Sequence, residues 1–142
     1  MANDMFMDDG FFAFEKLDVY RQATDSVVTA YRLTRTFSEK ERFGLTSQIR
    51  RAATSVTLNI AEGRGRGSER DFARFLHQAR GSLLEVVTGF HLAERLDFIT
   101  RQDTRAIYAQ AHHLSGKLVT LIRASTSLSP SSGSVLVQKG TQ

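Results

Sequence analysis

Arginine is concentrated in one part of this sequence. Between Arg35 and Arg80 there are ten basic residues against five acidic residues, so this stretch carries +5, whereas the whole chain carries +4. The guanidinium group of arginine forms paired hydrogen bonds with phosphate and carboxylate groups. Such a local excess predicts a partner that carries one of these groups. The arginines expected to contact phosphate are Arg50, Arg51, Arg64, Arg66, Arg70 and Arg74.

Two of these arginines lie in a glycine-rich segment, Glu62-Gly63-Arg64-Gly65-Arg66-Gly67-Ser68, which precedes a predicted helix. Backbone N–H groups at the start of a helix favour anions. The segment is not a nucleotide-binding motif, because neither G-x-G-x-x-G nor G-x-x-x-x-G-K-[ST] is present and no strand is predicted before it. Two interpretations stay open: a phosphate-contact site, or an ordinary turn between two helices.

A row of polar residues shares one face of the helix predicted before this segment, because its members are three or four residues apart. The row consists of Gln48, Arg51, Ser55, Asn59 and Glu62. It could line a site, or it could hydrogen-bond to neighbouring helices, as buried polar groups require. The second interpretation is favoured, because no general base, nucleophile and oxyanion donor converge there. The acidic member of the row is expected to pair with Arg64, Arg66 or Arg74.

Gly81 and Ser82 lie inside the next predicted helix, where glycine costs about 1 kcal/mol relative to alanine. Close approach of another helix or of another subunit would offset that cost. Glu85 lies one turn further along the same side and could meet an arginine of the preceding helix or of another subunit. The predicted structural or interface residues are Gln48, Ser55, Asn59, Glu62, Gly63, Gly81, Ser82 and Glu85.

The sequence lacks the patterns of common catalytic and metal sites. It contains no cysteine, which excludes disulfides, thiolate metal sites and cysteine nucleophiles. His112 and His113 are adjacent, so on a helix they point about 100° apart. His91 shares a face with one glutamate, but paired E-x-x-H motifs are absent, and no G-x-S-x-G nucleophile motif occurs. No catalytic residue, cofactor or metal site is therefore predicted, and we expect the protein not to be an enzyme.

The candidate residues are expected to lie on four helices and their connections. These helices are predicted from apolar residues that recur at three- and four-residue steps. The first helix is expected over residues 17–36, the second from 38 or 39 to 62, the third from 69 to 96 and the fourth from 101 onward. The links between them are short, so neighbouring helices should be antiparallel. The predicted fold class is all-α, an antiparallel up-down four-helix bundle.

Each predicted helix carries an apolar stripe and a terminal signal. The stripes are Leu17, Tyr20, Ala23, Val27, Ala30, Tyr31 and Thr34; Leu45, Ile49, Ala52, Val56 and Ile60; Phe72, Phe75, Leu76, Ala79, Leu83, Val86, Phe90 and Ala93; and Ile107, Ala111, Leu114, Leu118, Leu121 and Ile122. The pairs with capping-box spacing are Ser38 with Glu41, Ser68 with Asp71 and Thr100 with Asp103. Gly63 suits the position after a helix end, where positive φ is common.

Composition is typical of one globular domain, with 142 residues, 41% hydrophobic and 24% charged. We expect a flexible N-terminal segment over 1–13, the bundle over 14–124 and a disordered serine-rich tail over 125–142. No apolar run approaches the ~18 residues of a membrane-spanning helix, and the N-terminus does not have the pattern of a secretory signal. A cytoplasmic protein without membrane association is expected.

Several segments of the chain resemble one known family. They are Leu17-Asp18-Val19-Tyr20; Glu41-Arg42-Phe43-Gly44-Leu45-Thr46-Ser47-Gln48-Ile49-Arg50-Arg51-Ala52-Ala53; Ser55; Asn59-Ile60-Ala61-Glu62-Gly63; Arg66; Phe72; Arg74-Phe75-Leu76; Ala79; Gly81-Ser82; and Glu85. From about Phe14 to Arg123 the chain resembles the bacterial four-helix-bundle proteins, or 23S rRNA intervening-sequence proteins. It departs from them in lacking a tryptophan near Tyr20 and a proline near Ser38.

The resemblance implies a four-helix subunit that assembles into a ring-like homopentamer. Some members of this family are encoded inside insertions within 23S rRNA genes. A distantly similar group comprises accessory proteins of reverse transcriptases in diversity-generating retroelements, in which a basic pentamer surface contacts nucleic acid. No biochemical activity is firmly assigned to the family.

Two functional hypotheses follow. The leading one is a non-enzymatic, oligomeric protein that binds nucleic acid, RNA rather than DNA, non-specifically through its arginine-rich surface. No aromatic-rich RNA-recognition motif is present, so base readout is not predicted. The alternative is a protein-interaction scaffold or accessory subunit, with a partner protein and no nucleic-acid role, whose arginines form ion pairs between subunits. The acidic residues in those pairs would be Glu62, Glu69, Asp71 or Glu85.

Overall fold

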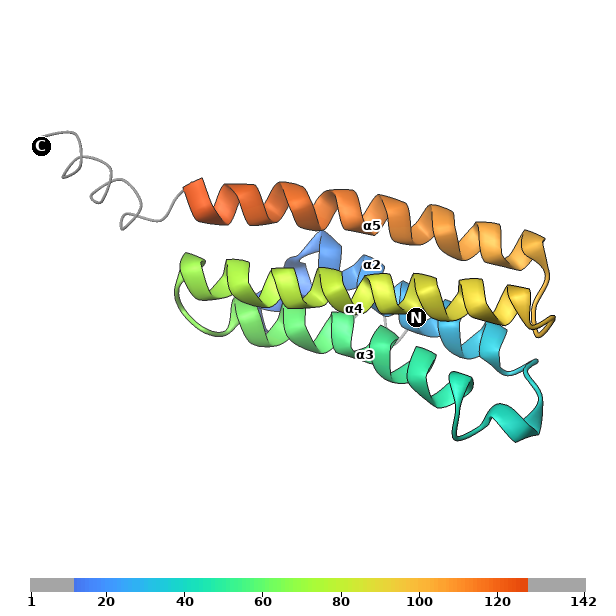
Figure 1. Ribbon diagram of the computed structural model, residues 1–142. Coiled ribbons are helices and arrows are strands. Elements are labelled where there is room, and N and C mark those ends of the chain that lie inside the picture. Colours follow the sequence, from blue (N-terminus) through green and yellow to red (C-terminus); the bar gives the residue numbers. More distant parts are fainter. Residues whose placement is uncertain (1–11, 128–142) are drawn as a thin grey trace, which may run out of the picture.

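Four long helices account for most of residues 12–127, the part of the chain that the computed structural model describes. They are α2 (Asp18–Thr34), α3 (Leu45–Arg64), α4 (Glu69–Arg95) and α5 (Arg101–Ser127), and two short 3-10 helices, η1 (Ala13–Lys16) and η2 (Glu39–Glu41), precede α2 and α3. Successive long helices run antiparallel, and α2 lies behind α3 and α4 in the view of Figure 1. Over these residues there is no strand, which confirms the all-α class with four helices.

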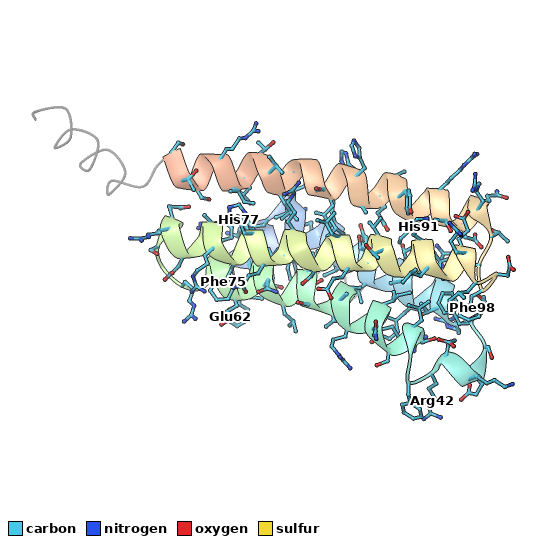
Figure 2. All side chains as sticks on the ribbon, in the orientation of Figure 1. Arg42, Glu62, Phe75, His77, His91 and Phe98 are labelled. Atoms are coloured by element: carbon cyan, nitrogen blue, oxygen red, sulfur yellow. The ribbon has the colours of Figure 1, made fainter. Side chains whose placement is uncertain are left out.

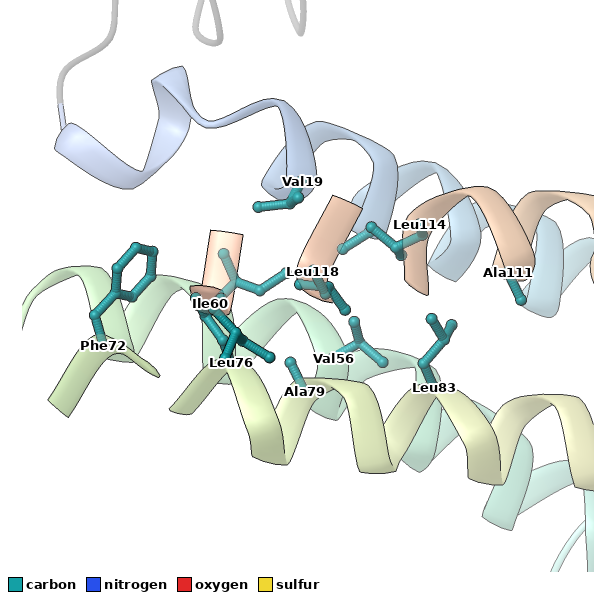
Figure 3. Packing of buried hydrophobic residues seen from close by; sticks show 12 residues of the cluster. Val19, Val56, Ile60, Phe72, Leu76, Ala79, Leu83, Ala111, Leu114 and Leu118 are labelled. Atoms are coloured by element: carbon teal, nitrogen blue, oxygen red, sulfur yellow. The ribbon is translucent and has the colours of Figure 1, made fainter. Parts of the chain in front are cut away.

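The helices enclose a core in which each packs on two neighbours: α3 on α2 and α4, and α5 on α4 and α2. Figure 3 shows one end of that core, the cluster to which Val19 of α2, Ile60 of α3, Leu83 of α4 and Leu118 of α5 belong. All eight residues of the stripe predicted for α4 are buried. On α3 and α5 the stripes are buried as well, except that Leu45 and Leu121 are only partly covered.

The stripe predicted for α2 was partly wrong. Val19 and Leu33 are in the core, whereas Tyr31 keeps 40% of its surface exposed. The prediction began at Leu17, which lies in extended backbone before the helix at φ −75° and ψ 130°. Ala23, Ala30 and Thr34 of the predicted stripe are buried, so the prediction erred by including Tyr31 and by omitting Val19 and Leu33.

The second long helix begins later than predicted. Ser38 caps only the short helix η2, by accepting a hydrogen bond from the Lys40 N–H at 3.3 Å. The carboxylate of Glu41 instead accepts the Leu45 N–H at 3.2 Å, so it caps the start of α3. Gly44 separates the two helices with φ −107° and ψ −114°. This break leaves Phe43 on the surface, where 88% of its area is exposed.

The other predicted helix starts are confirmed. The Asp71 N–H donates to Ser68 Oγ at 3.1 Å at the start of α4, and the Asp103 N–H donates to Thr100 Oγ1 at 3.2 Å at the start of α5. Both bonds satisfy backbone donors that have no partner inside the helix.

The role predicted for Gly63 was wrong. It lies inside α3, and a Cβ added there would sit 2.6 Å from the Cβ of Phe75. Glycine is therefore required for the close approach of α4 and not for a turn. Positive φ occurs instead at Gly67, at 86°.

The last helix extends to Ser127, and Ser125 is buried, so the predicted domain boundary at 124 falls inside its final turn. Of the predicted flexible segment over 1–13 and the predicted disordered tail over 125–142, residues 1–11 and 128–142 lie outside the described residues, whereas Ala13 begins η1 and residues 125–127 belong to α5. Within those residues, no helix combines the length and the apolar character that crossing a membrane requires.

Candidate nucleic-acid interface

The six predicted arginines fall into two groups at opposite ends of α3. Arg50 and Arg51 lie in its first half. The other group, which we call the turn arginines, comprises Arg64, Arg66, Arg70 and Arg74 at the α3–α4 connection. The helical rise separates Arg50 from Arg64 by about 21 Å. Figure 2 shows the same two ends: Glu62 and Phe75 lie beside the connection, and Arg42 lies at the far end.

Three turn arginines are paired with carboxylates of the same chain. The pairs are Arg64 with Glu69 at 4.0 Å, Arg66 with Glu62 at 3.6 Å, and Arg74 with Asp71 at 3.5 Å. These pairs are solvent-exposed, and exposed pairs contribute little to stability. They do reduce the positive charge available to a polyanion. Arg70 is exposed and makes no ion pair with any residue between 12 and 127.

The same three arginines also cover buried aromatic rings. The guanidinium carbon of Arg64 lies 5.6 Å from the centre of the Phe72 ring. Those of Arg66 and Arg74 lie 5.0 Å and 4.6 Å from the Phe75 ring. Cations over ring faces are attracted electrostatically, so these arginines complete the packing at the α3–α4 connection.

The first group lines a surface hollow of about 540 Å³. Its lining residues are Tyr31 of α2, Arg42 and Phe43 before α3, and Thr46, Ser47, Arg50, Arg51, Thr54, Ser55 and Leu58 of α3. We call this feature the α3 hollow. Three arginines and no carboxylate line it, so it differs in charge from the α3–α4 connection.

Arg50 is held in place at the edge of the α3 hollow. Its Nε donates to Thr34 Oγ1 at 2.8 Å, and Thr34 is buried. Its guanidinium carbon lies 4.5 Å from the centre of the Tyr31 ring. No carboxylate within residues 12–127 pairs with it. The side chain is therefore ordered by the protein while its charge is left without a counter-ion.

Arg51 and Arg42 are more exposed. Arg51 Nη2 lies 3.5 Å from Ser47 Oγ. Arg42 pairs with Glu39 at 3.4 Å, and its guanidinium carbon lies 5.1 Å from the centre of the Phe43 ring. Sequence reasoning missed Phe43 and Tyr31 as residues of this region. The available signal was that Phe43 does not fall on the apolar stripe of the following helix, although it is large and aromatic.

The polar row on α3 is divided between two environments. Ser55 Oγ lies 2.9 Å from Ser82 Oγ of α4, and Asn59 Nδ2 donates to the Ser55 carbonyl oxygen at 2.9 Å and to Ser55 Oγ at 3.0 Å. These bonds join α3 to α4. Gln48 and Glu62 point into solvent, so the row does not converge on one site.

The two remaining interface candidates on α4 are exposed. A Cβ at Gly81 would meet nothing within 4 Å, so no other helix in the described part of the chain requires glycine there. Glu85 makes no ion pair with residues 12–127. Contact with another subunit stays a prediction for both.

Residues 12–127 contain no group of three or more histidine, cysteine or acidic side chains that could hold a metal ion. Lys117 donates a hydrogen bond that holds the pKa of Asp18 below its ordinary value, and burial raises the pKa of Tyr20. Both groups lie at the start of α2, about three turns before Tyr31. Neither displaced pKa belongs to the α3 hollow.

The chain is similar to a solved structure of a protein with unknown function from the S23 ribosomal protein family of Bacteroides thetaiotaomicron VPI-5482. The TM-score is 0.66 at 25% sequence identity, over 73% of this chain and 97% of that chain. No curated protein matches, and the distant similarity to retroelement accessory proteins stays a prediction. Residues 15–120 match the model of a family described as 23S rRNA-intervening sequence protein. Since that match covers most of the bundle, the chain belongs to the 23S rRNA-intervening sequence protein family.

Proposed function

We propose that this protein is a non-enzymatic, homo-oligomeric nucleic-acid-binding protein that contacts phosphate groups, those of RNA rather than DNA, without sequence preference. The observation that carries the proposal is the α3 hollow, in which Arg50 and Arg51 have no carboxylate partner among residues 12–127, while Arg42 pairs with Glu39. A surface of this kind attracts a polyanion, and arginine matches the geometry of phosphate oxygens. We place the protein in the cytoplasm, in keeping with a sequence free of cysteine.

The oligomer that we propose is a ring-like homopentamer, as the family resemblance implies. Each subunit would present one α3 hollow, so a single strand could contact several hollows at once. Linked contacts of this type raise the overall affinity well above that of one site. The exposed apolar side chains of Leu84 and Leu92 on α4, which are 52% and 48% exposed, are candidates for the contacts between subunits.

The scaffold alternative has less support. Three of its four proposed acidic residues, Glu62, Glu69 and Asp71, already pair with arginines of their own chain. Intersubunit pairs would have to replace these contacts. Of these four acidic residues, Glu85 alone makes no ion pair with the residues that the structure describes.

The direct test of the proposal is the salt dependence of RNA binding by nuclease-treated protein. Fluorescence anisotropy of a labelled single strand should give a log–log slope near ~0.7 for each phosphate contact. Competition with DNA of the same sequence measures the preference for RNA. No binding at low salt, or binding that salt does not weaken, would contradict the proposal.

Light scattering tests the oligomer and separates the two functions. The expected mass is five times the subunit mass of 15.9 kDa. If nucleic-acid binding is the function, Arg51→Ala should weaken RNA binding and leave the mass unchanged. If Arg51 forms a subunit contact, as the scaffold alternative holds, the same substitution should lower the mass.

A further inference from the structure

Phe43 is an exposed aromatic ring within an arginine-lined surface. It keeps 88% of its area exposed, although a large apolar side chain is normally covered. The helix break at Gly44 holds it outside the core. The guanidinium carbon of Arg42 lies over the ring, 5.1 Å from its centre. The ring is therefore available to a ligand that is both flat and compatible with positive charge.

The other groups of the α3 hollow narrow the chemistry of that ligand. Arg50 and Arg51 lie on the same wall as the hydroxyl groups of Ser47 and Thr54. The wall thus combines cations with groups that donate or accept hydrogen bonds. The volume of about 540 Å³ falls in the range of small-molecule sites, roughly 300–1,000 Å³. One nucleotide is a ligand of suitable size.

Three ligand classes can be compared on these features. A simple polyanion would use the arginines and leave the Phe43 ring exposed. An apolar protein surface would cover the ring and also bury Arg50 and Arg51, which have no carboxylate partner among residues 12–127. Burying unpaired charges is costly. A nucleotide has a base that stacks on the ring and a phosphate that pairs with arginine, so it satisfies both features.

We propose that the α3 hollow binds an unpaired nucleotide, with the base stacked on Phe43 and the phosphate paired with Arg51 and Arg50. This inference rests on the nucleic-acid-binding function proposed above and deepens it. In a duplex the base faces are stacked on one another, so the ring can reach them only in a single strand. The protein should therefore prefer single-stranded over double-stranded RNA.

A tryptophan introduced at Phe43 gives a direct reporter, because the natural sequence contains no tryptophan. The Phe43→Trp protein should bind oligouridine with quenching of its emission, since stacking brings a base onto the indole ring. Inorganic polyphosphate of matched charge should cause no quenching and bind more weakly. Equal affinity for polyphosphate and oligouridine would overturn the inference and leave the phosphate-binding function in place.

The Phe43→Leu variant separates stacking from general apolar contact. Leucine keeps an apolar side chain but has no ring face, so oligouridine affinity should fall at least about fivefold. Affinity for duplex RNA should not change. The matched control is Leu96→Ala, which alters an exposed side chain at the end of α4 and should change neither affinity.

The remaining outcomes are also decisive. If Phe43→Leu leaves oligouridine affinity unchanged while Arg51→Gln lowers it, the stacking inference fails and the proposed function stands. If Phe43→Leu lowers the oligomer mass in light scattering, the hollow is a subunit contact and the inference fails. If oligouridine, duplex RNA and polyphosphate all fail to bind at low salt, the proposed function itself fails.

Discussion

Arginines lie at both ends of α3, but they differ in whether a carboxylate of the same chain pairs with them. At the α3–α4 connection, Arg66 has Glu62 four residues before it and Arg74 has Asp71 three residues before it, and both pairs form. Arg50 and Arg51 have no acidic residue three or four positions away in either direction. Spacing of this kind decides whether a helical arginine finds a partner on its own helix. The number of arginines in a segment therefore does not measure the charge available to a ligand.

The aromatic rings of the two regions differ in how far they are exposed to solvent. Phe75 is buried beneath Arg66 and Arg74, so those arginines extend the packing of the bundle. Phe43 is exposed beside Arg42, so that pair leaves a ring open to solvent. At the α3–α4 connection, arginine covers a buried phenylalanine ring, whereas at the α3 hollow the phenylalanine ring is exposed to solvent.

The largest expected effect concerns the structural region. Gly63→Ala should lower the free energy of unfolding by about 1–3 kcal/mol, because the new Cβ overlaps the Cβ of Phe75 and the backbone must shift. The control is Gly116→Ala inside α5, where a Cβ meets nothing within 4 Å and alanine should stabilise the helix by up to about 1 kcal/mol. Urea denaturation measures both. Equal effects at the two glycines would contradict the close contact between α3 and α4.

The proposed difference in phosphate binding between the α3 hollow and the α3–α4 connection is tested by neutralising one arginine in each region. Arg51→Gln should reduce the salt slope of RNA binding by ~0.7 and weaken binding about fivefold at moderate salt. Arg66→Gln should change neither quantity appreciably, since Arg66 already pairs with Glu62. Anisotropy titrations at several salt concentrations give both slopes. A larger effect at Arg66 than at Arg51 would reverse our assignment of the two regions.

A hydrogen bond between α3 and α4 gives a smaller effect. Ser55→Ala should cost about 0.5–1.5 kcal/mol of stability, because Ser82 loses its partner. In a double-mutant cycle, Ser82→Ala should then cost less in the Ser55→Ala background than in the natural protein. Additive costs would show that the two hydroxyl groups do not interact in solution.

The smallest effect is expected for an exposed ion pair on another face. The Lys117 hydrogen bond lowers the pKa of Asp18, so the pair stabilises the fold above the ordinary value of 3.8 and this stabilisation is lost as pH falls through the lowered pKa. Because both side chains are largely exposed, Asp18→Asn should cost less than about 1 kcal/mol at neutral pH. The difference from the natural protein should disappear in acid. A large cost at neutral pH would mean that the exposed pairs of the α3–α4 connection also contribute substantially to stability.

Most of the fold was predictable because its signals are local. The stripe of α4 and the caps at Ser68 and Thr100 depend on residues within a few positions of one another. The predicted start of α3 was wrong because the spacing of Ser38 and Glu41 fits either one capped helix or two successive helices. Ser38 and Glu41 have capping-box spacing, yet each caps a different helix because Gly44 interrupts the backbone between them.

The candidate site was predictable only in part, for the same reason. Arg50 and Arg51 could be named from composition, whereas the difference between their contacts and those of the turn arginines depends on which carboxylates and rings lie against each one. Tyr31 was assigned to the core on periodicity, and its place beside Arg50 of the next long helix could not be read from its own helix.

The sequence by itself therefore determined four amphipathic helices and a surplus of arginine, since helical periodicity and charge are properties of neighbouring residues. Only the tertiary structure decided what the key residues do. The contact of Gly63 with Phe75, the hydrogen bond from Ser55 to Ser82 and the hollow around Phe43 all join residues from separate elements. Their geometry depends on how the helices pack, which no local pattern specifies.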